Sequence, residues 1–105
     1  MSKVGVSLAS SYGTDLSSRR IAALLRQSIL KALSASSPFT IDFVGVRTVS
    51  DSFADELFGV LVAENGTEWL RDHLSLVGLS PELRTVILSA IQRGLKRTPS
   101  EHNVC

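Results

Sequence analysis

Three short runs of the chain carry the apolar pattern of β-strands. Residues 4–8 alternate apolar with small side chains, 39–44 read FTIDFV, and 74–79 read LSLVGL. The second run keeps a period of two until Val44 and Val46 add further apolar positions. These two valines predict that the second strand is covered on both faces near its end.

Three longer runs repeat apolar residues at helical spacing. The first covers 16–33, and either Asp15 or Ser17 is its expected N-cap. The second covers 52–64, and the third opens at the Ser-Pro-Glu sequence of 80–82, where a capping residue is followed by proline at the first helical position. Strands and helices therefore alternate in the order β-α-β-α-β-α.

The remaining segments are predicted to connect or end these elements. Hydroxyl residues and a glycine make 10–14 a loop, and small polar residues with a proline end the first helix at 34–38. Residues 67–73 fit both a helix and a loop. The polar segment 98–105 is expected to form a flexible tail, so the folded domain is predicted to span 1–97.

Alternating strands and helices predict an α/β fold, with helices packed on a small parallel or mixed sheet. Three strands leave at least one sheet edge without a partner. Such an edge is a surface through which a second copy of the chain could pair to form a homodimer.

Composition fits a single compact domain. Hydrophobic residues make up 44% and charged residues 20% of the 105 residues, and the net charge of +1 does not indicate a polyanion-binding surface. The single cysteine, Cys105, permits no internal disulfide. The apolar run near the N-terminus is interrupted by Gly5 and Ser7, and no run approaches the ~20 residues of a membrane span. A cytoplasmic location without membrane contact is therefore expected.

The segment 42–59 holds the candidate site. An apolar run ends in a short loop where Ser50 and Ser52 bracket Asp51, and a helical pattern begins at once. Ser52 with Asp55 three residues later approximates a capping box, and Ser50 is an equally good N-cap. On this interpretation the acidic side chains complement the helix dipole.

The same segment resembles the signature of STAS domains, the fold of bacterial anti-anti-sigma factors, and more closely that of STAS-like bacterial proteins. The matching residues are Ser18-Arg19 with Ala22, Asp42-Phe43 with Gly45-Val46, and the run from Ser50 to Phe58. The resemblance implies a STAS-like fold over nearly the whole chain. It also implies a regulatory, signalling role like that of an anti-sigma factor antagonist, carried out by binding another protein rather than by catalysis.

In the anti-anti-sigma factors a serine of this motif is phosphorylated by a histidine-kinase-like ATPase. By position that serine is Ser52, with Ser50 as a second candidate, and the resemblance implies such an ATPase or another signalling protein as the partner. A phosphate there would meet the free amides of a helix N-terminus and add about −1.5 to −2 charge. The candidate partner-binding residues are Arg19, Arg47, Asp51, Ser52, Asp55 and Glu56.

Two other classes of function are weaker alternatives. An enzyme would use the acidic residues Asp51, Asp55 and Glu56 together with Arg19, but no histidine or cysteine accompanies them at metal-ligand spacing. No catalytic, cofactor-binding or metal-binding residue is therefore assigned. Nucleic-acid recognition would use a basic face on the last helix, for which more cations and exposed aromatic residues are needed. The basic residues of that helix are Arg84, Arg93, Lys96 and Arg97.

Overall fold

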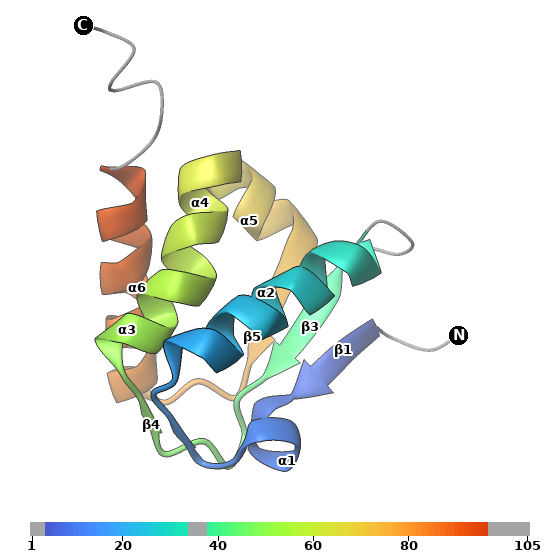
Figure 1. Ribbon diagram of the computed structural model, residues 1–105, viewed down its shortest axis with the longest axis vertical. Coiled ribbons are helices and arrows are strands. Elements are labelled where there is room, and N and C mark those ends of the chain that lie inside the picture. Colours follow the sequence, from blue (N-terminus) through green and yellow to red (C-terminus); the bar gives the residue numbers. More distant parts are fainter. Residues whose placement is uncertain (1–3, 34–37, 97–105) are drawn as a thin grey trace, which may run out of the picture.

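The computed structural model describes residues 4–33 and 38–96. The flexible tail expected over 98–105, most of the segment expected to end the first helix, and Arg97 of the basic face lie outside the described residues. Within the described part, the α/β prediction is confirmed (Figure 1).

The strands form two small parallel sheets. In the main sheet the order is β1-β3-β5, with Val6, Ile41 and Leu76 in register, so both neighbouring pairs are parallel. A second, two-residue ladder joins β2 to β4. The strand bounds are β1 Val4–Ser7, β2 Asp15–Leu16, β3 Phe39–Asp42, β4 Thr48–Val49 and β5 Leu74–Val77.

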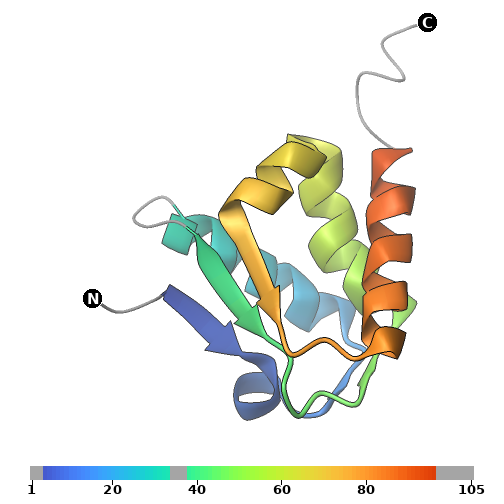
Figure 2. The ribbon, with the colours of Figure 1, turned by 180° about the vertical axis from the view of Figure 1, so that it is seen from behind.

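The helical segments lie mainly on one face of the main sheet. Seen from behind, β1, β3 and β5 stand in front of α2 and α4, while α6 runs beside α4 on the β5 side (Figure 2). The helix bounds are α1 Leu8–Tyr12, α2 Arg19–Leu33, α3 Asp51–Ala54, the π-helical η1 Asp55–Gly59, α4 Val60–Asn65, α5 Thr67–His73 and α6 Pro81–Leu95.

The core lies between the helices and the sheet. Alternation along each strand sends Val6, Ile41 and Leu76 toward the helices, and Ile41 is fully buried. The intervening row on the opposite face consists of Gly5, Thr40 and Ser75, which are small or polar. The sheet is therefore apolar on the face that the helices cover, and small or polar on the other apart from the exposed Val77.

The predicted second helix is confirmed as one continuous helical stretch, α3-η1-α4, with a π turn in the middle. The wider turn carries Leu57, Phe58 and Gly59 in succession, and all three are buried. This stretch crosses α6 so closely that a Cβ atom on Gly94 would lie 2.3 Å from the carbonyl oxygen of Gly59. Glycine at 94 thus allows the two helices to meet backbone to backbone.

Two local predictions were wrong. Val44 is 64% exposed, because β3 ends at Asp42 and the chain then turns away from the sheet, so the strand end is not covered on both faces. The strand predicted over 4–8 ends at Ser7, and the loop predicted over 10–14 is also wrong, because Leu8–Tyr12 form the short helix α1. Leu8 accounts for this second difference, because the helical turn buries its side chain completely in the core.

Candidate functional site

The β2–β4 ladder holds the starts of α2 and α3 side by side (Figure 1). Asp15 pairs with Thr48 and Leu16 with Val49, and the amide of Ser50 donates to the carbonyl of Leu16 at 2.8 Å. The Thr48 hydroxyl also donates to the Asp15 carboxylate at 2.9 Å. Two segments 33 residues apart in sequence therefore enter their helices from one place at the carboxyl end of the sheet.

Serine caps mark three helix starts. Ser18, Ser50 and Ser80 each accept a hydrogen bond from the amide three residues later, at 3.1, 3.0 and 3.2 Å. Each hydroxyl satisfies one of the amides that a helix N-terminus leaves without an intrahelical partner. The cap predicted for the last helix at residue 80 is confirmed.

The cap prediction for the first helix is corrected, and of the two caps predicted for the second helix Ser50 is confirmed and Ser52 is wrong. Helix α2 begins at Arg19, so Ser18 is the residue whose hydroxyl caps it, and Asp15 and Ser17 lie too far upstream. Helix α3 begins at Asp51 with Ser50 as its N-cap, so Ser52 is already inside the helix and forms no capping box with the residue three positions on. Ser50 therefore caps α3, and the hydroxyl of Ser52 has no capping role.

Arg19 lies against Ser52, from the neighbouring helix. Its Nη2 donates to the Ser52 Oγ at 3.4 Å, and its Nη1 is 3.6 Å from Glu56 Oε1. Arg26, about two turns further along α2 on the same side, forms a closer pair with Glu56, at 3.0 Å between Nη1 and Oε2, and also contacts the Glu56 backbone carbonyl. Glu56 is therefore held by two arginines of α2.

Arg93 of α6 holds the other acidic side chains. Its Nε donates to Asp55 Oδ1 at 2.9 Å, its Nη2 lies 2.8 Å from the same oxygen, and Asp51 Oδ1 is 3.9 Å from Nη2. The hydrogen bond that Arg93 donates to Asp55 raises the pKa of the Arg93 guanidinium above its ordinary value, and the charges of both aspartates add to this effect. The first turns of α3-η1 are thus tied by arginines to α2 on one side and to α6 on the other.

The six predicted partner-binding residues separate into two groups. Five come together at the start of the α3-η1 stretch: Arg19, Asp51, Ser52, Asp55 and Glu56. Arg47 lies apart, at the β2–β4 ladder, where its Nε is 3.8 Å from an Asp15 carboxylate oxygen. It is 74% exposed, compared with 63% for Arg19.

Two residues of the cluster were missed or misread in the sequence. Arg26 was not singled out, although it lies four residues after Ala22 and three before Ile29, on the buried stripe of its helix. A cation on such a stripe signals a buried acidic partner. Arg93 was assigned to a basic face of the last helix, but its guanidinium pairs with Asp55 of the neighbouring helical stretch.

The cavity beside these helix starts is small. About 90 Å³ of space is lined mainly by α2 and the segment before it, with Tyr12, Ser18, Ile21 and Phe53 among the lining residues. Cavities that enclose small-molecule ligands are usually about 300–1,000 Å³. Among the described residues, no group of three histidine, cysteine or acidic side chains is arranged to hold a metal ion.

The fold and the position of the site define a small α/β domain of parallel strands in which serine-capped helices begin together at the carboxyl end of the sheet. Residues 22–84 match the family described as a STAS-like domain of unknown function. The match runs from α2 to the beginning of α6 and covers more than half of the chain. The protein belongs to this STAS-like family, which confirms the resemblance seen in the sequence.

No curated protein and no solved structure matches the chain. Within residues 4–33 and 38–96, no helix is both long enough and apolar enough to cross a lipid bilayer.

Proposed function

We propose that this STAS-like domain is a regulatory module that binds another protein, in the manner of an anti-sigma factor antagonist. The contact surface is formed by residues 46–52 and the outward side of α3. The observation that carries this proposal is the contact between Arg19 and the hydroxyl of Ser52 at a helix start. A partly buried serine beside an exposed arginine is a suitable acceptor for a regulatory phosphate.

The charges around Ser52 support a phosphate there better than the sequence alone indicated. Asp55 and Glu56 would oppose a phosphate if they were free, but Asp55 is paired with Arg93 and Glu56 with Arg26. Arg19 is 63% exposed and its contact with Glu56 is the longer of the two that Glu56 makes. Arg19 can therefore turn to a Ser52 phosphate while Arg26 keeps Glu56 in place.

Exposed charges at the rim favour a protein partner of mixed charge. Arg47 and Asp51 are 74% and 76% exposed, and they flank the loop that leads into α3. Exposed charges of opposite sign on one surface favour orientation and specificity of a protein contact. By family resemblance we propose a histidine-kinase-like ATPase, or another signalling protein, as the partner and as the source of the phosphate.

The experiment compares affinity capture by wild type and by surface variants, followed by quantitative mass spectrometry. Arg47→Glu and Asp51→Lys change the proposed surface, and Glu64→Lys, an exposed position on α4, is the matched control. We expect a partner that wild type and the control retain and that both surface variants lose. A partner retained equally by all four proteins would exclude this surface.

The role of Ser52 is tested on that same partner. Protein carrying phosphoserine at 52 is expected to bind at least tenfold more weakly than the unmodified chain, whereas Ser52→Ala binds normally. Replacing Arg19 by glutamine should change the response to the phosphate without removing binding of the unmodified protein. Equal binding with and without the phosphate would refute the switch while leaving the interaction itself intact.

A further inference from the structure

The outward side of α6 carries a seam that residues 4–33 and 38–96 leave exposed. Thr85, Leu88, Gln92 and Leu95 are all exposed, and Leu88 and Leu95 are 54% and 37% exposed. Their spacing of three, four and three residues is that of a helix-pairing seam, in which successive side chains stay on one line along the helix. The inner side of α6, by contrast, packs through residues such as Ile87 into the core.

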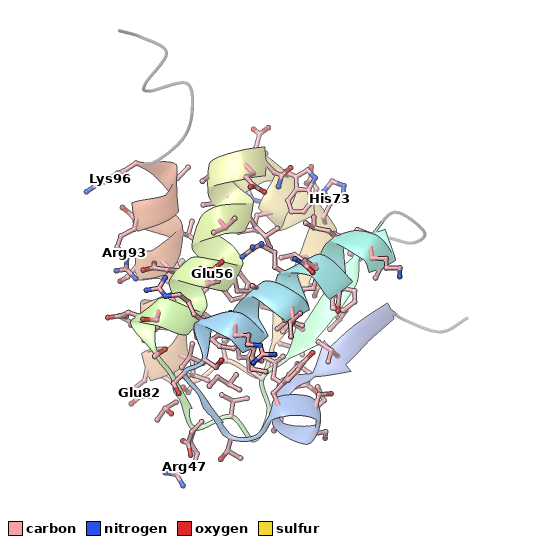
Figure 3. All side chains as sticks on the ribbon, viewed as in Figure 1. Arg47, Glu56, His73, Glu82, Arg93 and Lys96 are labelled. Atoms are coloured by element: carbon pink, nitrogen blue, oxygen red, sulfur yellow. The ribbon has the colours of Figure 1, made fainter. Side chains whose placement is uncertain are left out.

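The charged residues beside this seam are arranged so that a second copy of α6, related by a two-fold axis, brings opposite charges together. Glu82 and Lys96 lie at opposite ends of α6 (Figure 3), and their separation of 14 residues, nearly four full turns, puts them on the same flank. Ser89 lies midway between them on that flank, and Ile91 lies on the opposite flank. If two such helices pair antiparallel, residues of the same flank meet each other, so the acidic end of each helix meets the basic end of the other.

We propose that the seam Thr85–Leu88–Gln92–Leu95 docks against the same seam of a second copy of this chain, with the two α6 helices antiparallel. In this arrangement Leu88 of each copy packs on Gln92 of the other, and Thr85 packs on Leu95. Glu82 of each copy pairs with Lys96 of the other, once on each side of the two-fold axis. The contact is isologous, so it closes at a dimer.

Charge selects this arrangement over a parallel one. Parallel pairing would bring the flank of Glu82 and Lys96 against the partner's opposite flank, which carries Ile91, so neither charge would meet its complement. The polar residues Thr85 and Gln92 in the seam lower its strength but set the register. A helix of 15 residues is about 22 Å long, so the contact falls among small interfaces, and we expect a dissociation constant on the order of 10–100 μM.

The α6 seam differs from the sheet edge that the sequence suggested for pairing. The edge strands β1 and β5 have only four residues each, and short edge strands are poor templates for strand addition. The two surfaces can be separated by mutation, because no residue of the seam lies in a strand.

Sedimentation equilibrium of the full chain from about 5 μM to 1 mM tests the dimer. Wild type is expected to change from monomer to dimer across this range, and Leu88→Asp is expected to stay monomeric. The control is Leu24→Asp on α2, because Leu24 is 50% exposed and lies off the seam. A wild type that stays monomeric at 1 mM, or a Leu88→Asp protein that dimerises like wild type, overturns the proposal; the latter result would indicate another surface such as a sheet edge.

Charge reversal tests the register and needs no partner other than the chain itself. Glu82→Lys and Lys96→Glu should each weaken the homodimer about tenfold, because each variant places like charges together at both contacts. Mixing the two variants should restore association as a heterodimer, since every contact then joins a lysine to a glutamate. Thermal unfolding verifies that both variants are folded, and failure of the mixture to associate more tightly than either variant alone refutes the antiparallel register.

Discussion

Replacing Gly94 by alanine tests whether the close approach of α6 to the α3-η1-α4 stretch is required by the fold. In an ordinary helix this change stabilises, because alanine is favoured over glycine by about 1 kcal/mol. Here the added Cβ would lie 2.3 Å from the Gly59 carbonyl oxygen and 2.5 Å from a Val62 methyl carbon. The valine side chain can move, but the carbonyl belongs to the backbone of a buried helix.

The size of the effect follows from this geometry. Side-chain carbons essentially never approach within 3.0 Å of such an atom, so the two helices must separate by roughly 0.7 Å or more. Overpacking of this kind costs about 1–3 kcal/mol, to which looser contacts between α6 and the rest of the core add. After subtraction of the helix-propensity gain, we expect Gly94→Ala to lower the free energy of unfolding by about 1–2 kcal/mol, and Gly94→Val by more.

Chemical denaturation followed by circular dichroism measures this free energy directly. A loss of 1–2 kcal/mol corresponds to a fall in Tm of roughly 5–15 °C for a domain of this size. Arg84→Ala, an exposed substitution on the same helix, is the control and should change stability by less than about 0.5 kcal/mol. A Gly94→Ala protein as stable as wild type, or more stable, would refute the claim that backbone contact holds α6 at this distance.

Three further predictions concern the polar contacts of the site. Glu56→Gln should destabilise the protein by about 1–3 kcal/mol, because Arg26 is only 16% exposed and loses its charged partner. Glu64→Gln on the surface is the control and should leave stability unchanged. Equal effects of the two substitutions would show that the Arg26–Glu56 pair contributes nothing. Ser50→Ala should cost about 1 kcal/mol through the lost cap and Ser52→Ala much less, and the reverse order in denaturation experiments would contradict the cap assignment. Asp55 raises the pKa of the Arg93 guanidinium, which already lies far above neutrality. The stabilisation from this pair is therefore complete below the pKa of Arg93 in the unfolded state, and it is lost only as pH rises through the pKa of the folded state. The stability difference between wild type and Arg93→Gln should therefore be constant from pH 6 to 9, and a difference that changes within that range would show that another titrating group controls the contact.

Features set by near neighbours along the chain could be predicted from the sequence. The last helix was placed correctly from Ser80 and Pro81, because a cap and a proline at the first position act within one helical turn. The alternation of strand and helix patterns was enough for the fold class, and the run from Ser50 to Phe58 was enough for the family. Each of these depends on spacings of a few residues, which the printed sequence shows directly.

Contacts between distant segments were decided only by the tertiary structure. Which serine caps α3 depends on where β4 ends, and β4 exists because it pairs with residues of β2 more than 30 residues earlier. Arg93 looked like a solvent-facing cation near a helix end until packing placed Asp55 beside it, from 38 positions away. The sequence by itself therefore determined a STAS-like α/β domain with a serine-rich helix start. The tertiary structure decided that Ser50 caps this helix and that Ser52 faces Arg19, because hydrogen bonds and ion pairs across such distances depend on how whole elements pack and not on local propensity.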